Sequence, residues 1–174
     1  MANKKVDNLA IANLRVLAIE AINEAKSGHP GIALGAAPIL HNLYCYHLKV
    51  DPKNSNWFNR DRFVMSAGHG SSILYATLAL AGYKISLKDL KNFRQLDSPT
   101  PGHPEVDITD GVDVSTGPLG QGIGMAVGLA MAESHLSKVF NKEDVRIVDH
   151  YTYCLCGDGD LQEGVALEAL SFAG

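Results

Sequence analysis

The chain has 174 residues, of which 46% are hydrophobic and 20% are charged, and its formal net charge is −4 at pH 7. This length and composition predict one folded domain with a substantial core, and they exclude a disordered chain. The acidic balance argues against nucleic acid or an anionic membrane as the main partner, and no apolar run approaches the ~20 residues of a membrane span.

Apolar residues recur at helical spacing in the first part of the chain. A helix is predicted over residues 7–26, and one of its faces carries Ile11, Leu14, Ala18, Ala21, Ile22 and Ala25. The segment SGHPG ends this helix, because glycine and proline do not continue a helix cheaply. A second helix, from about Ala33 to His47, is apolar nearly all round, which predicts that it is buried.

The rest of the chain alternates short apolar segments with helices. FVMS (63–66) and HYTYCLC (150–156) are predicted strands, and the second is apolar on both faces, as in a central parallel strand. Helices are predicted for SSILYATLALAGY, for SLKDLKNF, whose Ser86 and Asp89 form a capping-box pattern, and from GPLGQGIG to about Phe140. Residues 95–117 form a long loop of the kind that is usually functional. The alternation predicts an α/β fold with a parallel sheet flanked by helices.

The chain contains three cysteines, Cys45, Cys154 and Cys156, which are too few for a disulfide framework. No signal peptide is evident, so we expect a reduced, cytoplasmic protein. Cys154 and Cys156 are interpreted as small buried hydrophobic residues rather than ligands.

Three glycine-rich segments follow predicted strands or open a helix: SAGHGS, STGPLGQG and CGDGDLQEG. Ligands of open α/β sheets bind at the carboxyl ends of strands, where glycines let backbone N–H groups approach phosphate oxygens. The spacing fits neither a Walker P-loop nor the dinucleotide fingerprint, which disfavours a nucleotide-binding dehydrogenase. Gly124 and Gly128 are interpreted as packing positions that let their helix lie close to a neighbour.

Asp158 lies between two glycines directly after the second predicted strand. A carboxylate facing a diphosphate would be repelled unless a cation lay between them, and Mg²⁺ takes such oxygen ligands. The alternative is a surface turn in which Asp158 caps a helix that begins near Leu161. On this tripeptide alone both interpretations stay open.

Three of the seven histidines, His29, His69 and His103, share a Gly-His-Pro or Gly-His-Gly context on loops. Neutral imidazoles there could bind a substrate hydroxyl or carbonyl and move protons near neutral pH. A single loop histidine is more often only solvated, and three in one setting favour a site. No zinc-binding spacing is present. The remaining histidines are interpreted as structural: His41, His47, His135 and His150.

The ordered segments SGHPG, SAGHGSSILYA, PGHPE, STGPLGQGIGMAVGLAMAE and CGDGDLQEGVALEA resemble the N-terminal cofactor domain of transketolases, from about residue 10 onward. The resemblance implies a thiamine-diphosphate-binding fold of which residues 1–174 are the N-terminal part of the diphosphate-binding domain, with the pyrimidine-binding and C-terminal domains absent. It implies reversible transfer of a two-carbon ketol unit from a ketose phosphate to an aldose phosphate in the pentose phosphate pathway. The implied cofactors are thiamine diphosphate and Mg²⁺ or Ca²⁺.

The resemblance also implies cofactor contacts. Asp158 matches the family's metal-ligating aspartate, and Gly159 matches a diphosphate contact. His69 matches a histidine that contacts the diphosphate and borders the substrate channel. The loop that lies against the cofactor is matched by Gly117, Pro118 and Leu119.

Substrate and subunit contacts follow from the same resemblance. His29 and His103 match histidines that bind the donor ketose near its C1 hydroxyl and carbonyl, and Glu163 matches a glutamate at the subunit contact of a homodimer. The family's second metal ligand, an asparagine, and its catalytic glutamate would follow Gly174, so we expect these residues to be inactive alone. Asp160 is unassigned beyond a capping role. The alternative is a non-catalytic, cofactor-binding subunit of a split thiamine-diphosphate enzyme.

Overall fold

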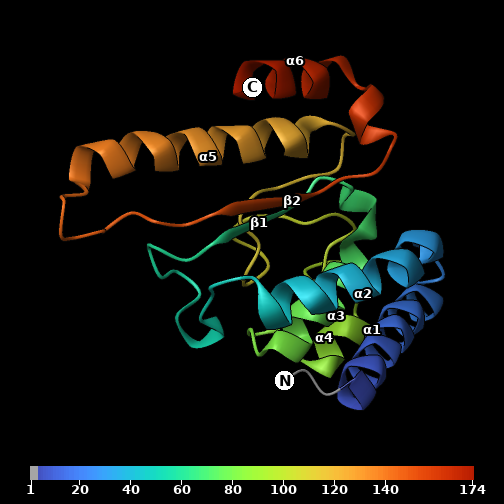
Figure 1. Ribbon diagram of the computed structural model, residues 1–174. Helices are drawn as coiled ribbons and strands as arrows, with labels where there is room; N and C mark the ends of the chain where they lie inside the picture. The colour runs from blue at the N-terminus through green and yellow to red at the C-terminus, as the bar shows by residue number, and fades with distance from the viewer. Residues whose placement is uncertain (1–3) are drawn as a thin grey trace.

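The computed structural model describes residues 4–174, in which a small parallel sheet separates two groups of helices (Figure 1). On one side lie α1 (Lys4–Ala25), α2 (Pro30–Tyr46), α3 (Ser71–Ala81) and α4 (Leu87–Lys91). On the other side lies α5 (Gln121–Phe140), which is covered in turn by α6 (Gly164–Ala173).

The sheet consists of β1 (Arg62–Met65) and β2 (Thr152–Leu155), which pair in parallel with Arg62 opposite Thr152 and Met65 opposite Leu155. Parallel strands require a long crossover, and the segment between them supplies α3, α4, the long loop and α5. The predicted α/β architecture with a parallel sheet flanked by helices is confirmed.

The main core lies among α1 to α4 and the β1 side chains that face them. The predicted face of α1 is buried at Leu14, Ala18, Ala21 and Ile22. Two of these four positions are alanines, which allow close helix packing. Tyr75 and Phe93 fill the centre with rings 6.2 Å apart.

The predicted helix ends are largely those of the structure. Gly82 ends α3 with φ 98°, a left-handed conformation that glycine adopts without strain. The capping box of α4 is complete, since Ser86 Oγ accepts from the Asp89 N–H and Asp89 Oδ2 accepts from the Ser86 N–H.

Two burial predictions are wrong. The second helix is buried on one side only, and Leu34 and Ile39 on its other side are 46% and 55% exposed, because α1 and α3 cover a single face. In β2, Cys154 is exposed, as is Cys156 just beyond the strand. Within residues 4–174, β2 pairs only with β1, and Cys154 and Cys156 line an apolar cavity of about 530 Å³ between β2, α5 and α6.

The packing role assigned to Gly124 and Gly128 is also wrong. A Cβ atom on Gly128 would meet no described atom within 4 Å, and one on Gly124 would only touch Ala169 at 3.9 Å. The close approach is at Gly122, where a Cβ would lie 2.4 Å from the Ser66 Cα. That position holds the start of α5 against the end of β1.

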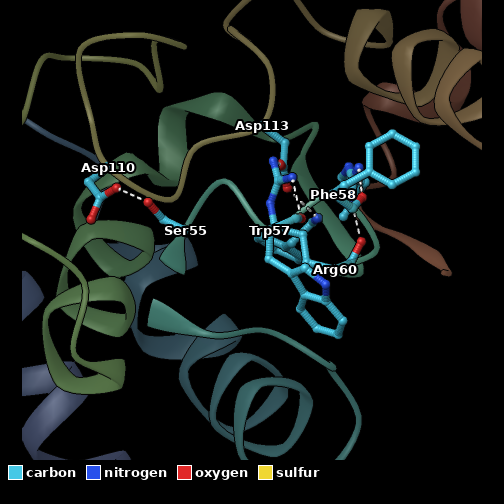
Figure 2. Close-up of polar contacts among 8 residues, drawn as sticks. Ser55, Trp57, Phe58, Arg60, Asp110 and Asp113 are labelled. Atoms are coloured by element: carbon cyan, nitrogen blue, oxygen red, sulfur yellow. Dashed lines mark hydrogen bonds and ion pairs between the residues drawn. The ribbon is translucent and has the colours of Figure 1, made fainter. Parts of the chain in front are cut away.

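The long loop of residues 95–117 contains no helix or strand, as predicted, and carboxylates fasten it to the segment before β1 (Figure 2). Asp110 accepts from Ser55 Oγ at 2.6 Å, and Asp113 pairs with Arg60 at 2.5 Å. The second oxygen of Asp113 accepts from the Phe63 N–H at 2.8 Å. These bonds tie the loop to β1 itself and so fix its path beside the sheet.

Candidate active site

The candidate site is built where β1 and β2 end. Because the strands are parallel, their following loops leave from the same edge of the sheet. The N–H groups of Ser66 and Ala67 donate to the Leu155 carbonyl at 2.9 and 3.3 Å. The SAGHGS and CGDGD segments therefore begin side by side.

The third glycine-rich segment lies against the first. Thr116 Oγ1 donates to the Met65 carbonyl at 2.7 Å, which holds this segment at the end of β1. A Cβ on Gly68 would lie 2.8 Å from the backbone nitrogen of Gly117. Only glycine at position 68 permits this approach of two backbones without a shift.

Asp160 joins all three segments. This residue is fully buried, and its Oδ1 accepts from Ser66 Oγ at 2.8 Å and from the Gly120 N–H at 2.9 Å. Its Oδ2 accepts from the Gly157 N–H at 2.8 Å. Burial alone would raise the pKa of Asp160, but these donors outweigh it and hold the pKa below its ordinary value.

Two of the loop histidines meet directly. The rings of His29 and His69 lie 5.1 Å apart in an edge-to-face arrangement. His29 precedes α2, whose first turn begins at Pro30, and His69 lies in the single 3-10 turn of Gly68–Gly70 that leads into α3. Residues distant in sequence are thus brought together by the starts of two packed helices.

His103 joins this group from the long loop. Tyr75 of α3 donates to the carbonyls of Pro101 and His103, each at 3.0 Å, and Ser71 Oγ donates to the Gly102 carbonyl at 2.7 Å. The His103 ring lies against Gly117, since a Cβ there would be 3.4 Å from His103 Cγ. Two side chains of α3 therefore place His103 beside the glycine-rich loop.

The electrostatics of the three histidines are coupled. Burial, and next the neighbouring His29, lower the pKa of His69. Burial lowers the pKa of His103 as well, followed by the charges of Arg94 and His29. Both rings are therefore neutral near pH 7, where a neutral imidazole can donate one hydrogen bond and accept another.

Comparison with known proteins identifies the family that carries this arrangement. Residues 6–174 match the family described as the thiamine diphosphate binding domain of transketolase. This chain belongs to the transketolase family. The resemblance found in the sequence is thereby confirmed.

Known transketolases are similar to this chain over nearly all of its length. The transketolase of Geobacillus stearothermophilus is 59% identical over 169 residues, which are 97% of this chain and 25% of that protein. The structure of the Leishmania mexicana transketolase superposes with a TM-score of 0.94 at 52% identity, over 99% of this chain and 25% of that one. A Pichia stipitis transketolase in complex with sedoheptulose 7-phosphate gives 0.95 at 50% identity, over 97% and 25%. The chain thus spans about a quarter of the length of the transketolases that it matches.

Two carboxylates follow β2, those of Asp158 and Asp160, and their surroundings differ. Asp158 is exposed and makes no hydrogen bond or ion pair with residues 4–174, whereas both oxygens of Asp160 are occupied. No helix is capped by Asp158: a 3-10 turn, Asp160–Gln162, follows, and the N-cap of α6 is Glu163 without a side-chain cap. The capping alternatives for both aspartates are wrong.

The cofactor loop of the transketolase resemblance faces this turn. A Cβ on Gly159 would lie 3.5 Å from Leu119 Cδ1, and Pro118 and Leu119 are both exposed. Within the described part of the chain, no three His, Cys, Asp or Glu side chains are grouped so that they could hold a metal ion. No helix of residues 4–174 is long and apolar enough to cross a membrane.

The sequence analysis did not predict the residues that connect the three glycine-rich segments. Asp160, Ser66 and Thr116 hold the three glycine-rich segments together. The only sequence signal was a second acidic residue directly after the Gly-Asp-Gly tripeptide. Two of the three partners of Asp160, Gly120 and Ser66, lie 40 and 94 residues away, so no local pattern could identify them.

Proposed function

We propose that these residues form the N-terminal part of the diphosphate-binding domain of a transketolase. The enzyme would transfer a two-carbon ketol unit reversibly from a ketose phosphate to an aldose phosphate. The observation that carries the proposal is the gathering of His29, His69 and His103 beside glycine-rich loops at the carboxyl edge of the parallel strands, in a chain of this family. The remaining domains would come from a longer protein or from a partner chain.

The residues after β2 fit a diphosphate and a divalent cation. Asp158 offers a carboxylate that no described protein group satisfies, which suits one ligand of Mg²⁺ or Ca²⁺. Gly159 and the loop of Gly117, Pro118 and Leu119 would lie along the cofactor, with His69 at its diphosphate. When bound, thiamine diphosphate supplies the electron sink for cleavage of the ketose C2–C3 bond.

Two of the histidines would bind the donor sugar. His29 and His103 would bind the hydroxyl on C1 and the carbonyl oxygen of the donor, and their N–H groups would stabilise charge that develops on these oxygens. The lowered pKa of His103 keeps its ring neutral near pH 7, so it can donate from one nitrogen and accept at the other. The sedoheptulose 7-phosphate bound by the Pichia stipitis relative supports a ketose phosphate as donor.

A homodimer is part of the same proposal. Glu163 is exposed, and its backbone is held close to α5, since a Cβ on Gly120 would lie 2.6 Å from the Glu163 Cβ. This places the carboxylate at the surface beside the candidate site, where a second subunit could contact it. A cytoplasmic location also stays a prediction.

The test uses the complete enzyme with thiamine diphosphate and Mg²⁺. His103→Ala should lower the rate of donor-ketose cleavage by about 10²-fold, in the range for loss of one transition-state donor. His135→Ala, on the far end of α5, is the matched control and should leave the rate unchanged. A His103→Ala enzyme that cleaves the donor at the original rate would refute this role.

A further inference from the structure

A second group of titratable side chains lies away from the candidate site, where α1 meets α2. Cys45 and His41 are one helical turn apart on α2, and Cys45 Sγ lies 3.5 Å from His41 Nδ1. His41 Nε2 lies 3.1 Å from Asp7 Oδ1 on α1, and the same carboxylate oxygen accepts from the Tyr46 hydroxyl at 2.5 Å. None of these residues belongs to the transketolase-like site.

The carboxylate determines which nitrogen of His41 carries the proton. The Tyr46 hydroxyl, and next His41, lower the pKa of Asp7, so this side chain is ionised at neutral pH and can only accept hydrogen bonds. His41 Nε2 must then donate to Asp7, which leaves the Nδ1 lone pair facing Cys45. His41 is only 8% exposed, so its ring is held in this orientation.

The thiol is a neutral donor to that lone pair. Partial burial, and then the negative charge of Asp7, raise the pKa of Cys45, so the sulfur keeps its proton at pH 7. The ionisable groups that interact with it are Asp7 from α1 and His41 and Tyr46 from α2. A Cys–His–carboxylate series of this kind lets a base remove the thiol proton during attack.

A cavity of about 360 Å³ opens beside the thiol. Its walls come from α1, α2, α3 and the segment after α2, and they include Leu14, His41, Tyr44, Cys45, Thr77 and Leu80. The volume is in the lower part of the range for small-molecule sites, roughly 300–1,000 Å³. Mostly apolar walls and the nearby Asp7 charge favour a small, uncharged ligand over an anion.

We propose that Cys45 is a site of covalent modification by small, uncharged electrophiles with a carbonyl-activated C=C bond, and that His41 is its general base. The sulfur forms a bond to the β-carbon of the electrophile, and the π electrons of the C=C bond shift to the α-carbon. The thiol proton passes to His41 Nδ1 and from there to the α-carbon. One bond of the double bond is consumed, no group leaves, and no external oxidant or reductant is needed.

The test measures how fast N-ethylmaleimide labels Cys45 in the full chain, by mass spectrometry of the Cys45 peptide. His41→Gln should slow labelling at pH 7 at least tenfold, within the reach of general-base catalysis, roughly 10²–10⁴-fold. His47→Gln at the C-cap of α2 is the matched control, since the His47 ring bonds only to Asn42 among the described residues, and should label at the original rate. Equal rates in the original protein and His41→Gln would overturn the proposal.

A second measurement on the unchanged protein covers the case in which His41→Gln does not fold. The labelling rate of an ordinary thiol rises about tenfold per pH unit up to its pKa near 8.5. With His41 as the base, the labelling rate of Cys45 should instead rise much less than tenfold per pH unit, because the neighbouring imidazole accepts the thiol proton. A maleimide that bears a carboxylate should label more slowly. A rate that rises about tenfold per pH unit up to about pH 8.5 would contradict the proposal.

Discussion

At the scale of single residues, two aspartates on the same turn have opposite surroundings. Asp158 is exposed and leaves its carboxylate available, whereas Asp160 is fully buried and accepts from Ser66, Gly120 and Gly157. The turn thus leaves one carboxylate exposed to solvent and uses the other to hold the loops in place.

Asp160→Asn should destabilise the fold by about 2–3 kcal/mol, because hydrogen bonds to a charged acceptor are lost and an amide group must face N–H donors. Asp158→Asn is the matched control and should change the free energy of unfolding by less than about 0.5 kcal/mol. Urea denaturation of both variants measures the difference. Equal stabilities would show that Asp160 does not hold the loops.

Acid should act through the same carboxylate. The pKa of Asp160 is below its unfolded value of 3.8, so its contribution to stability is present above that pH and is lost as the pH falls through the folded value. The original protein should therefore lose more stability than Asp160→Asn below about pH 4. Unfolding curves at a series of acidic pH values test this, and parallel losses in the two proteins would contradict it.

The protonation of His69 and of His103 should depend on the neighbouring His29. Burial and then His29 lower the pKa of His69. Burial, and then Arg94 and His29, lower the pKa of His103. Both rings should therefore titrate below 6.5. Their contribution to stability is present above 6.5 and is lost as the pH falls below it. His29→Gln removes a like charge and should raise both midpoints, which NMR of the imidazole protons can follow. Midpoints that stay in place would show that the rings are independent.

At the scale of secondary-structure elements, local signals predicted most of what the chain forms. Apolar spacing located α1, and the Ser86–Asp89 pattern located the start of α4, because both depend on neighbours within one or two turns. Burial of α2 and β2 could not be predicted in this way. It depends on which elements lie across from them. Among residues 4–174, α1 and α3 cover one face of α2, and a cavity between β2, α5 and α6 leaves Cys154 exposed.

The glycines of α5 illustrate the same limit on a smaller scale. Gly122→Ala should destabilise the protein by about 3 kcal/mol, since its Cβ would overlap the Ser66 backbone at 2.4 Å. Gly128→Ala on the same helix should stabilise it by roughly 0.5–1 kcal/mol, because alanine favours the helix and meets no described atom there. Thermal unfolding of the two variants compares them. The reverse order would refute the contact between α5 and the end of β1.

At the scale of the whole molecule, the sequence predicted the parallel α/β fold and the three loop histidines. Their setting on glycine-containing loops was readable because such loops follow strands or open helices. How the loops are held together was not readable. Asp160, at the carboxyl edge of the sheet, binds partners that are distant in sequence. The same holds at the amino edge, where Asp61 accepts from the Lys49 and Tyr151 N–H groups.

The central proposal is that these residues would hold one side of a site for thiamine diphosphate and a divalent cation, and that they would not complete this site alone. Calorimetric titration of thiamine diphosphate, with Mg²⁺ and with a chelator, tests it directly on residues 1–174 and on the longest natural chain that contains them. We predict weak or no binding by residues 1–174. In the longer chain we predict Mg²⁺-dependent binding that Asp158→Asn weakens at least tenfold, or about 1.4 kcal/mol. Tight binding by residues 1–174 alone, or Mg²⁺-independent binding that Asp158→Asn leaves unchanged, would contradict the claim.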